Sequence, residues 1–311
     1  MPGEWALSSQ PEGNGSKAES VAVDFTLPAD AAPGIYALRV ANQEGISNPK
    51  LVLIEDLPVE ISSGSNQSFE AAQMVSFPVA IDGFSPSLAK HFYKFSVAEA
   101  QRLSVEVYAR RIGSMLDPVV YLYDASGRIL TYADDSAGLQ RDCQLEYQLP
   151  AAGEYLIEIR DIEYKGGNTH PYHLRLGNFP LVHTAYPLAI PAGQETSVSL
   201  IGSSPENDQT VAITGSADKA TAALSAGSPS GTAFLALPTS TEPLFNETEP
   251  NDDAAAASPV TTEVGFIFNG KLDPVKDIDQ FKFTGKPEQW YLVKGVSEKI
   301  WLPSRPGHHS V

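Results

Sequence analysis

The chain has 311 residues, of which 42% are apolar, 24 are glycine and 24 are proline. That apolar content can supply hydrophobic cores and excludes wholesale disorder, and the length suits about two to four domains. The 38 acidic and 21 basic residues give a net charge of -17. This balance argues against nucleic acid or anionic membranes as partners, and it is compatible with cation binding.

Cys143 is the only cysteine in the sequence. An intrachain disulfide is therefore excluded, as are zinc sites built from four cysteines or from a cysteine pair and a histidine pair. No stretch reaches the roughly 18 to 20 apolar residues of a membrane helix, so we expect no membrane span. The N-terminus lacks the basic and apolar regions of a signal peptide.

The first unit is expected over residues 1–57. Residues 1–20 are polar and rich in turn formers, and we expect them to lack regular structure. Strands are expected at 21–27, 34–40 and 51–54, where apolar residues alternate or cluster between turn segments. The run from Pro33 to Val40, followed by Gly45-Ile-Ser-Asn-Pro49, resembles the closing strands of bacterial Ig-like domains.

The second unit is expected over residues 58–180. Its apolar patterns predict about eight strands, at 75–81, 92–97, 102–108, 119–123, 129–132, 143–149, 153–160 and 172–176. Strands at this spacing, with turn signals between them, indicate an antiparallel sandwich.

The third unit is expected over residues 181–243, with strands at 187–190, 196–201 and 231–237. Residues 218–230 are rich in Ala, Ser and Gly and show little periodicity. Few runs of helical period occur anywhere in the chain. The predicted fold class is therefore all-β, as tandem antiparallel β-sandwiches.

The fourth unit, residues 244–311, opens with an acidic stretch. Within seven residues it contains Glu247, Glu249, Asn251, Asp252 and Asp253, and Asp277 and Asp279 precede a later alternating run. Oxygen-rich side chains that converge from a linker and a strand start are what Ca²⁺ requires. The alternative is a soluble linker whose Asn and Asp side chains cap turns.

The second and fourth units repeat each other. Residues 93–101 align with 281–289 without a gap, and 81–83 match 268–270 with a one-residue shift. The first and third units correspond weakly, so the predicted order is A–B–A–B. Most of the proposed ligand positions differ between the B copies. The second unit is expected to place Ala89, His91, Gly64, Asn66, Ser68 and Phe69 where the fourth has Asp277, Asp279, Glu247, Glu249, Asn251 and Asp252.

The fourth unit is shorter than the second. Residues 290–295 still have strand character, whereas 301–311 do not, and nothing in this unit matches residues 119–178. With the missing start of the first unit and the absent signal peptide, this pattern suggests a gene fragment or a frameshifted reading frame.

Several short motifs mark the repeated units. The fourth unit has Glu249-Pro-Asn-Asp-Asp253, the Asn269-Gly270 turn and Asp277-x-Asp-x-Phe-x-Phe283; the second has Gly113-Ser-Met-Leu-Asp-Pro118, Asp134-Asp135, Gly153-Glu-Tyr155 and Arg160-Asp161. With these motifs the units resemble bacterial pre-peptidase C-terminal domains, which are jelly-roll-like sandwiches attached to secreted peptidases. The resemblance covers about 190 of the 311 residues. Alternation with Ig-like modules resembles large envelope proteins of planctomycete-type bacteria.

This resemblance implies a non-catalytic accessory role outside the cytoplasm. Related collagen-binding modules of clostridial collagenases hold calcium in the linker and the first strands, where it stabilises the sandwich. Their acidic ligands would match Glu247, Glu249, Asn251, Asp252, Asp277 and Asp279. We therefore expect Ca²⁺ as the one cofactor, bound by these six residues.

Other side chains offer weaker candidates. Asp134 and Asp135 form a second acidic loop. His170 and His173 have the spacing of a metal pair, although they lie where a loop enters a strand. Tyrosines at 108, 121, 123 and 132 would suit a carbohydrate or protein platform, or simply half-buried strand positions with wet hydroxyls.

Two function classes remain open. The first is a non-catalytic binding or spacer module of an exported protein, located outside the cytoplasm, monomeric, and with an unknown extracellular protein or polysaccharide as partner. The second is the C-terminal remnant of a secreted peptidase whose catalytic domain lies outside this chain. The sequence has no Gly-x-Ser-x-Gly, His-Glu-x-x-His or Walker motif, so the chain itself is not expected to be an enzyme.

Overall fold

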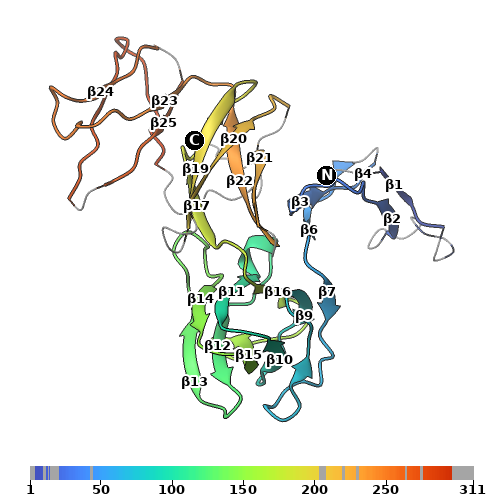
Figure 1. The fold of residues 1–311 in the computed structure, drawn as a ribbon. Coiled ribbons are helices and arrows are strands. Elements are labelled where there is room, and N and C mark those ends of the chain that lie inside the picture. Colours follow the sequence, from blue (N-terminus) through green and yellow to red (C-terminus); the bar gives the residue numbers. More distant parts are fainter. Residues whose placement is uncertain are drawn as a thin grey trace.

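The computed structural model describes residues 4–9, 12, 14, 21–42, 45–202, 208–218, 221–228, 231–262, 265–273 and 276–295. Over these residues the chain is all-β, and its only helical segment is the 3₁₀ turn η1 (Arg110–Ile112). This described part contains no helix that could cross a lipid bilayer. The second unit lies at the bottom of Figure 1, the third above it, and the first and fourth form arms at either side.

Two five-stranded sheets make up the second unit. One has the order β13 (Ile129–Ala133), β12 (Pro118–Asp124), β15 (Gly153–Asp161), β10 (His91–Val97) and β8 (Gln73–Met74). The other has the order β14 (Gln144–Leu149), β11 (Gln101–Tyr108), β16 (Pro171–Gly177), β9 (Val79–Phe84) and β7 (Val59–Ile61). Their inner faces enclose one apolar core, in which Tyr93, Val105, Leu122, Ile157 and Leu174 are fully buried.

The structure corrects the expected strand pattern of this unit in two ways. No strand covers all of 75–81: residues 75–78 lie in no strand, between β8, which ends at Met74, and β9, which begins at Val79 in the other sheet. Pro78 lies between them and has no N–H to donate to a ladder. The sheets are also not purely antiparallel, because the edge strands β7 and β8 pair in parallel with β9 and β10. Parallel neighbours need a long connection, which hairpin spacing does not predict.

The third unit contains two three-stranded sheets. Their orders are β17 (Val182–Tyr186), β19 (Glu195–Gly202), β20 (Gln209–Thr214), and β18 (Ile190–Pro191), β22 (Gly231–Ser240), β21 (Thr221–Ser228). A small core that includes Ile190, Val198 and Leu224 lies between them. The sequence did not predict β17, β20 or β21, and of the strand expected at 187–190 only Ile190 lies in a strand, as the first residue of β18. Small Ala, Ser and Gly side chains give β21 no alternating pattern, and its pairing with β22 defines it instead.

The first unit consists of three two-stranded pairs. These are β1 (Glu4–Leu7) with β2 (Val23–Thr26), β3 (Gly34–Leu38) with β6 (Lys50–Ile54), and β4 (Ala41–Asn42) with β5 (Gly45–Ile46). The expectation that residues 1–20 lack regular structure is wrong for β1. The backbone of β1 pairs in register with β2 from Glu4↔Thr26 to Leu7↔Val23.

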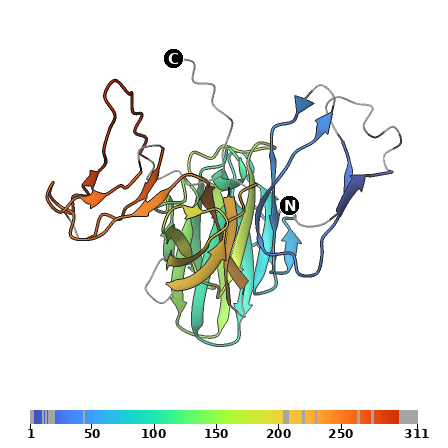
Figure 2. The same cartoon turned by 90° about the horizontal axis from the view of Figure 1, so that it is seen from above.

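The fourth unit also consists of short pairs. β23 (Leu244–Asn246) pairs in parallel with β25 (Ile267–Asn269), and β24 (Ser258–Pro259) with β26 (Phe281–Lys282). Rings of Phe245, Phe266, Phe268, Phe281 and Phe283 pack together between them. Residues 290–295 form no strand, contrary to expectation, and the Trp290 side chain is 98% exposed. Figure 2 shows the first and fourth units projecting from opposite sides of the central body.

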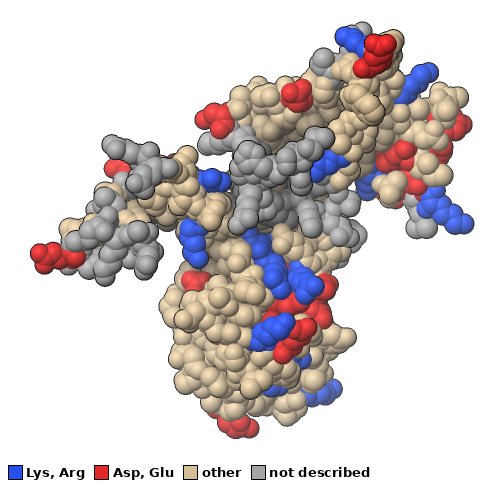
Figure 3. All heavy atoms as spheres, turned by 180° about the vertical axis from the view of Figure 1, so that it is seen from behind, with Lys and Arg blue, Asp and Glu red and all other residues tan. Residues whose placement is uncertain are grey.

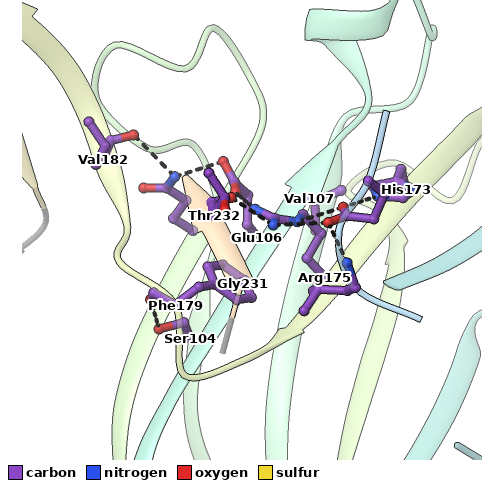
Figure 4. A network of polar contacts seen from close by, with 12 residues as sticks. Ser104, Glu106, Val107, His173, Arg175, Phe179, Val182, Gly231 and Thr232 are labelled. Atoms are coloured by element: carbon purple, nitrogen blue, oxygen red, sulfur yellow. Dashed lines mark hydrogen bonds and ion pairs between the residues drawn. The ribbon is translucent and has the colours of Figure 1, made fainter. Parts of the chain in front are cut away.

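A buried network of charged side chains joins the second unit to its neighbours. Figure 4 shows Arg175 of β16, which has no exposed surface, near Glu106 of β11 and Thr232 of β22. The Arg175 guanidinium donates to Glu106 Oε2 at 3.1 Å, to the Thr232 carbonyl oxygen at 2.8 Å and to Glu55 Oε1 at 3.1 Å. Because Glu55 follows β6, this one cation contacts the first, second and third units.

His173 and two aromatic rings complete this joint. The His173 imidazole lies 2.8 Å from Glu55 and 2.8 Å from Asp82. Burial alone would lower the pKa of His173, but the hydrogen bonds and charges of these two carboxylates outweigh burial and raise it. The rings of Tyr108 and Phe234 stack 5.2 Å apart across the second and third units.

Candidate metal centre

Three of the six predicted ligands meet in the fourth unit. One carboxylate oxygen each from Glu247, Glu249 and Asp279 lies within 4.8 Å of the other two. Calcium binds oxygens at about 2.3–2.6 Å, so two ligands on opposite sides of one ion lie about 5 Å apart. One hard cation can therefore contact all three carboxylates.

The backbone of the paired strands positions these carboxylates. Glu247 directly follows β23, and its N–H donates to the Asn269 carbonyl at 3.0 Å, which extends the β23–β25 pairing by one residue. Asp279 lies two residues before β26. Glu249 accepts the N–H of Asn251 at 3.0 Å, in a tight local turn. The two strand pairs thus hold the linker and the strand start side by side.

Two carboxylate oxygens in this cluster are buried and receive no hydrogen bond from the described residues. They are Oε2 of Glu247 and Oδ1 of Asp279. The other oxygen of Glu247 accepts the Lys271 N–H at 2.7 Å and the Tyr186 hydroxyl at 3.3 Å. Burial and the neighbouring Asp279 carboxylate raise the pKa of Glu247. Two buried carboxylate oxygens this close would be stabilised by a cation or a shared proton between them.

Gly270 provides the space in which the two acids approach. A Cβ at this position would lie 2.8 Å from Asp279 Oδ2 and 3.0 Å from Glu247 Oε2. The sequence analysis identified Asn269-Gly270 as one of the motifs of the fourth unit. The structure shows that the missing side chain of Gly270 leaves room for the two carboxylates. The glycine is therefore part of the candidate site.

The other three predicted ligands lie outside this cluster. Asn251 is fully buried, and its backbone carbonyl accepts the N–H of Gln280 at 3.2 Å. Asp252 has an exposed side chain, and its backbone carbonyl accepts the Gln280 side-chain amide at 2.7 Å. Asp277 accepts the backbone N–H of Asp273 at 2.6 Å. The contacts of Asn251 and Asp252 hold the linker against Gln280, which directly precedes β26. The carboxylates of Asp252 and Asp277 are not among the three that meet.

The third unit contributes a residue that sequence reasoning missed. Tyr186 lies at the end of β17, and burial together with the charges of Glu247 and Asp279 raises its pKa to about 12. Beside it, the buried Asn269 side chain accepts the Ala189 N–H at 3.0 Å and donates to the Ala189 carbonyl at 3.2 Å. The cluster therefore lies where the fourth unit docks on the third. No local sequence pattern predicts this docking, because the residues that hydrogen-bond across it are about 60 to 80 positions apart in the chain.

The second and fourth units share one backbone pairing of the kind that a repeat predicts. Tyr93 pairs with Gln73 in the second unit as Phe281 pairs with Ser258 in the fourth. This register agrees with the gap-free alignment from residue 93, so His91 occupies the position of Asp279.

The expected correspondence of the linkers is shifted by two residues. Ser62 donates its N–H to the Asp82 carbonyl at 2.8 Å, as Glu247 does to Asn269, and Asn66 accepts the Phe92 N–H at 2.8 Å, as Asn251 accepts that of Gln280. Ser62, Gly64, Asn66 and Gln67 therefore correspond to Glu247, Glu249, Asn251 and Asp252. The expected counterparts Gly64, Asn66, Ser68 and Phe69 were offset by two residues, because the segment between the linker and the strand differs in length between the two units.

A second acidic cluster lies in the second unit. Asp134 and Asp135 are joined there by Asp117, with one carboxylate oxygen of each within 4.8 Å of the others. Arg141 forms an ion pair with Asp117, so the guanidinium of Arg141 already supplies a positive charge at this cluster.

Figure 3 shows acidic side chains gathered on the fourth-unit arm, at the upper right of that view.

The histidine and tyrosine candidates have structural contacts instead. Both nitrogens of His173 are engaged by carboxylates, as described above, and His170 is buried. Tyr108 is fully buried and is no surface residue, contrary to the platform interpretation. Tyr121 stacks on Tyr132 with ring centroids 5.5 Å apart, and of the four tyrosines Tyr132 has the one largely exposed side chain, at 63%.

Known proteins resemble this chain over part of its length. Residues 89–161 match the family model of the bacterial pre-peptidase C-terminal domain. A probable subtilase-type serine protease of Deinococcus radiodurans is 38% identical over 164 residues, which cover 41% of this chain and 22% of that protein. The chain thus corresponds to about a fifth of that relative's length.

Two solved structures show weaker likeness. The pre-peptidase C-terminal domain of a Bacillus anthracis collagenase aligns with a TM-score of 0.28 and 15% identity, covering 34% of this chain and 93% of that one. PliG of Salmonella Typhimurium, a periplasmic inhibitor of g-type lysozyme, aligns with a TM-score of 0.22 and 13% identity, covering 38% and 97%. Scores this low support no structural argument. The sequence match places a pre-peptidase C-terminal domain at residues 89–161, within the second unit.

Proposed function

We propose that this chain is a non-catalytic accessory or spacer part of an exported bacterial protein, with a fourth unit stabilised by calcium. Its association with secreted proteases is supported by the pre-peptidase C-terminal match and by the subtilase-type relative. The expected partner is an extracellular protein or a polysaccharide. The tandem arrangement with Ig-like modules in the first and third units, and a monomeric state, remain part of this proposal.

One observation carries the calcium proposal: the two buried carboxylate oxygens of Glu247 and Asp279 that receive no hydrogen bond from the described residues. Buried like charges destabilise a fold unless something neutralises them. A hard divalent cation does so at several oxygens at once. Because Glu249 lies in the linker and Asp279 next to β26, the ion would tie the linker to the strand. Asn251, Asp252 and Asp277 stay predicted ligands for a loaded site.

Calorimetric titration of the metal-free full chain with calcium chloride tests this proposal. We expect one site, lost in Glu247→Gln combined with Asp279→Asn. Asp253→Asn is the matched control, because it removes a charge from the same linker at an exposed residue that is not a predicted ligand, and it should still bind. Absence of binding heat, with no change in hydrogen exchange around Glu247, would exclude the calcium site.

The second candidate is the C-terminal part of a secreted peptidase with its catalytic domain elsewhere. The subtilase-type relative favours it, since this chain covers 22% of that protein. Sequencing the gene upstream of residue 1 distinguishes the two. A serine-protease catalytic signature in the same reading frame supports the peptidase, and repeated non-catalytic modules support the spacer.

A further inference from the structure

Tyr172 of β16 occupies, in the second unit, the space that carboxylates occupy in the fourth. Its side chain is 2% exposed, and its hydroxyl lies 2.7 Å from His91 Nδ1 and 2.5 Å from the Tyr93 hydroxyl. A Cβ on Gly83 would lie 2.5 Å from that hydroxyl. Gly83 and Gly270 are the matching glycines of the two repeats, so both glycines face a polar side chain at the same place.

The linker of the second unit is tied down at this point. Ser62 Oγ lies 3.3 Å from His91 Nδ1. Four residues later, Asn66 is fully buried; its carbonyl accepts the Phe92 N–H at 2.8 Å and its amide donates to the Phe92 carbonyl at 3.0 Å. The linker is therefore fixed to β10 by backbone and side-chain contacts together.

We propose that Ser62, His91, Tyr93 and Tyr172, here called the hydroxyl cluster, replace the metal ion in the second unit. This unit then fixes its linker without a cation, whereas the fourth unit needs one. The contrast between the two units rests on the proposed calcium site, whereas the hydroxyl cluster is inferred from its own hydrogen bonds alone.

The chemistry of the groups supports this replacement. Hydroxyls and a neutral imidazole both donate and accept hydrogen bonds, so the cluster can satisfy itself. Ionised carboxylates only accept, and a pair of them needs an external positive charge. The four residues of the hydroxyl cluster include no carboxylate. Asp82, which precedes Gly83, is bound by His173 at 2.8 Å.

Hydrogen exchange on the full chain, with and without calcium, tests the proposal. In the wild type, removing calcium should speed exchange at residues 247–251 and leave residues 62–66 unchanged. Tyr172→Phe removes the central hydroxyl and should speed exchange at 62–66 about fivefold, equally with and without calcium, since a buried hydrogen bond contributes about 1 kcal/mol. Tyr164→Phe is the control, because this tyrosine is 38% exposed and lies outside the cluster.

Calcium-dependent exchange at 62–66 in the wild type would overturn the proposal, and so would a Tyr172→Phe variant that exchanges like the control. If 247–251 does not respond to calcium while Tyr172→Phe still accelerates 62–66, the calcium site fails and the hydroxyl cluster stands. A second variant tests the replacement in reverse. Ser62→Glu with His91→Asp and Tyr172→Ala should make protection at 62–66 calcium-dependent, and protection that ignores calcium in this variant counts against the proposal.

Discussion

The same backbone arrangement holds different chemistry in the second and fourth units. In both units a linker runs beside a glycine, and a linker N–H donates to the carbonyl of the residue directly before that glycine. In the second unit Gly83 faces the Tyr172 hydroxyl, and in the fourth Gly270 faces two carboxylates. Tyr172 belongs to β16, and the described residues of the fourth unit contain no strand equivalent to β16.

This difference shows that the space beside the matching glycine can be filled from different parts of the chain. In the second unit a distant strand supplies a neutral side chain. In the fourth unit, the linker and the strand start supply the groups themselves, as acids for which we propose calcium as the counter-ion. The backbone contact of Ser62 or Glu247 is common to both. Stability is therefore expected to respond to metal in one repeat and to side-chain truncation in the other.

The largest effect is expected for Tyr172→Ala. Removing this buried ring leaves a cavity and breaks two hydrogen bonds, so the second unit should lose about 3–5 kcal/mol of stability. Hydrogen exchange of the β9, β10 and β16 amides in the full chain measures this loss. A loss below about 1 kcal/mol would mean that the buried ring contributes little to the stability of the second unit.

Calcium addition should have the next largest effect, and only on the fourth unit. Binding to the folded state alone stabilises it by about 2.7 kcal/mol at a hundredfold excess over Kd. The Glu247 and Gln280 amides report this protection, because both hydrogen-bond across the linker. Equal protection of both repeats would remove the distinction between them.

Acidification should affect the two repeats in opposite directions. Burial lowers the pKa of His91 from 6.5 to about 4. Its neutral form therefore contributes stability that is present above about pH 6.5 and is lost as the pH falls towards 4. Burial and Asp279 raise the pKa of Glu247. Without calcium, its ionised form therefore costs stability as the pH rises through that raised pKa.

Each proton contributes at most about 1.4 kcal/mol per pH unit. Exchange at 62–66 and 247–251 from pH 7 to 5, corrected for the intrinsic rate, measures both trends. A common trend in the two segments would contradict the assignment of opposite chemistry. A His91→Gln variant should lose the acid sensitivity of the second unit.

The smallest effect is expected for Glu247→Gln without calcium. Neutralising one member of a close acid pair removes repulsion, so the metal-free fourth unit should gain about 1 kcal/mol. The same variant should no longer respond to calcium, as a titration of its exchange rates would show. Destabilisation of the metal-free variant would indicate that the Glu247 carboxylate is already neutralised, for example by a shared proton.

Alternating apolar patterns predicted most of the second unit, because its strands bury one face against a single core. Strands 101–108, 118–124 and 153–161 were found almost to the residue. Patterns failed where pairing, and not composition, defines the strand. Residues 221–228 carry small side chains with no alternation, and β7 and β8 are short edge strands whose parallel partners lie about 20 residues away.

The candidate site was predictable to the extent that its residues are close in sequence. Glu247 and Glu249 lie in one linker, and Asp279 was recognised because it precedes the alternating run at 281–283. The sequence could not separate them from Asp252 or Asp277, because which carboxylate turns inwards depends on backbone contacts such as that of Gln280 with Asp252. It could not indicate Tyr186 or Tyr172 either, since each arrives from a strand far along the chain.

Arg175 makes the second unit a poor cassette for exchange between proteins. Boundaries at residues 57 and 180 cut its contacts with Glu55 and with the Thr232 carbonyl. A transplant of residues 58–180 would keep the contact of Arg175 with Glu106 but lose these two partners, and removing a partner of a buried ion pair is strongly destabilising. Inheritance of this unit should therefore include the flanking carboxylate and the strand that follows. Recombination between related genes is expected to fall outside residues 55–232, and crossover points mapped in homologous genes can check this.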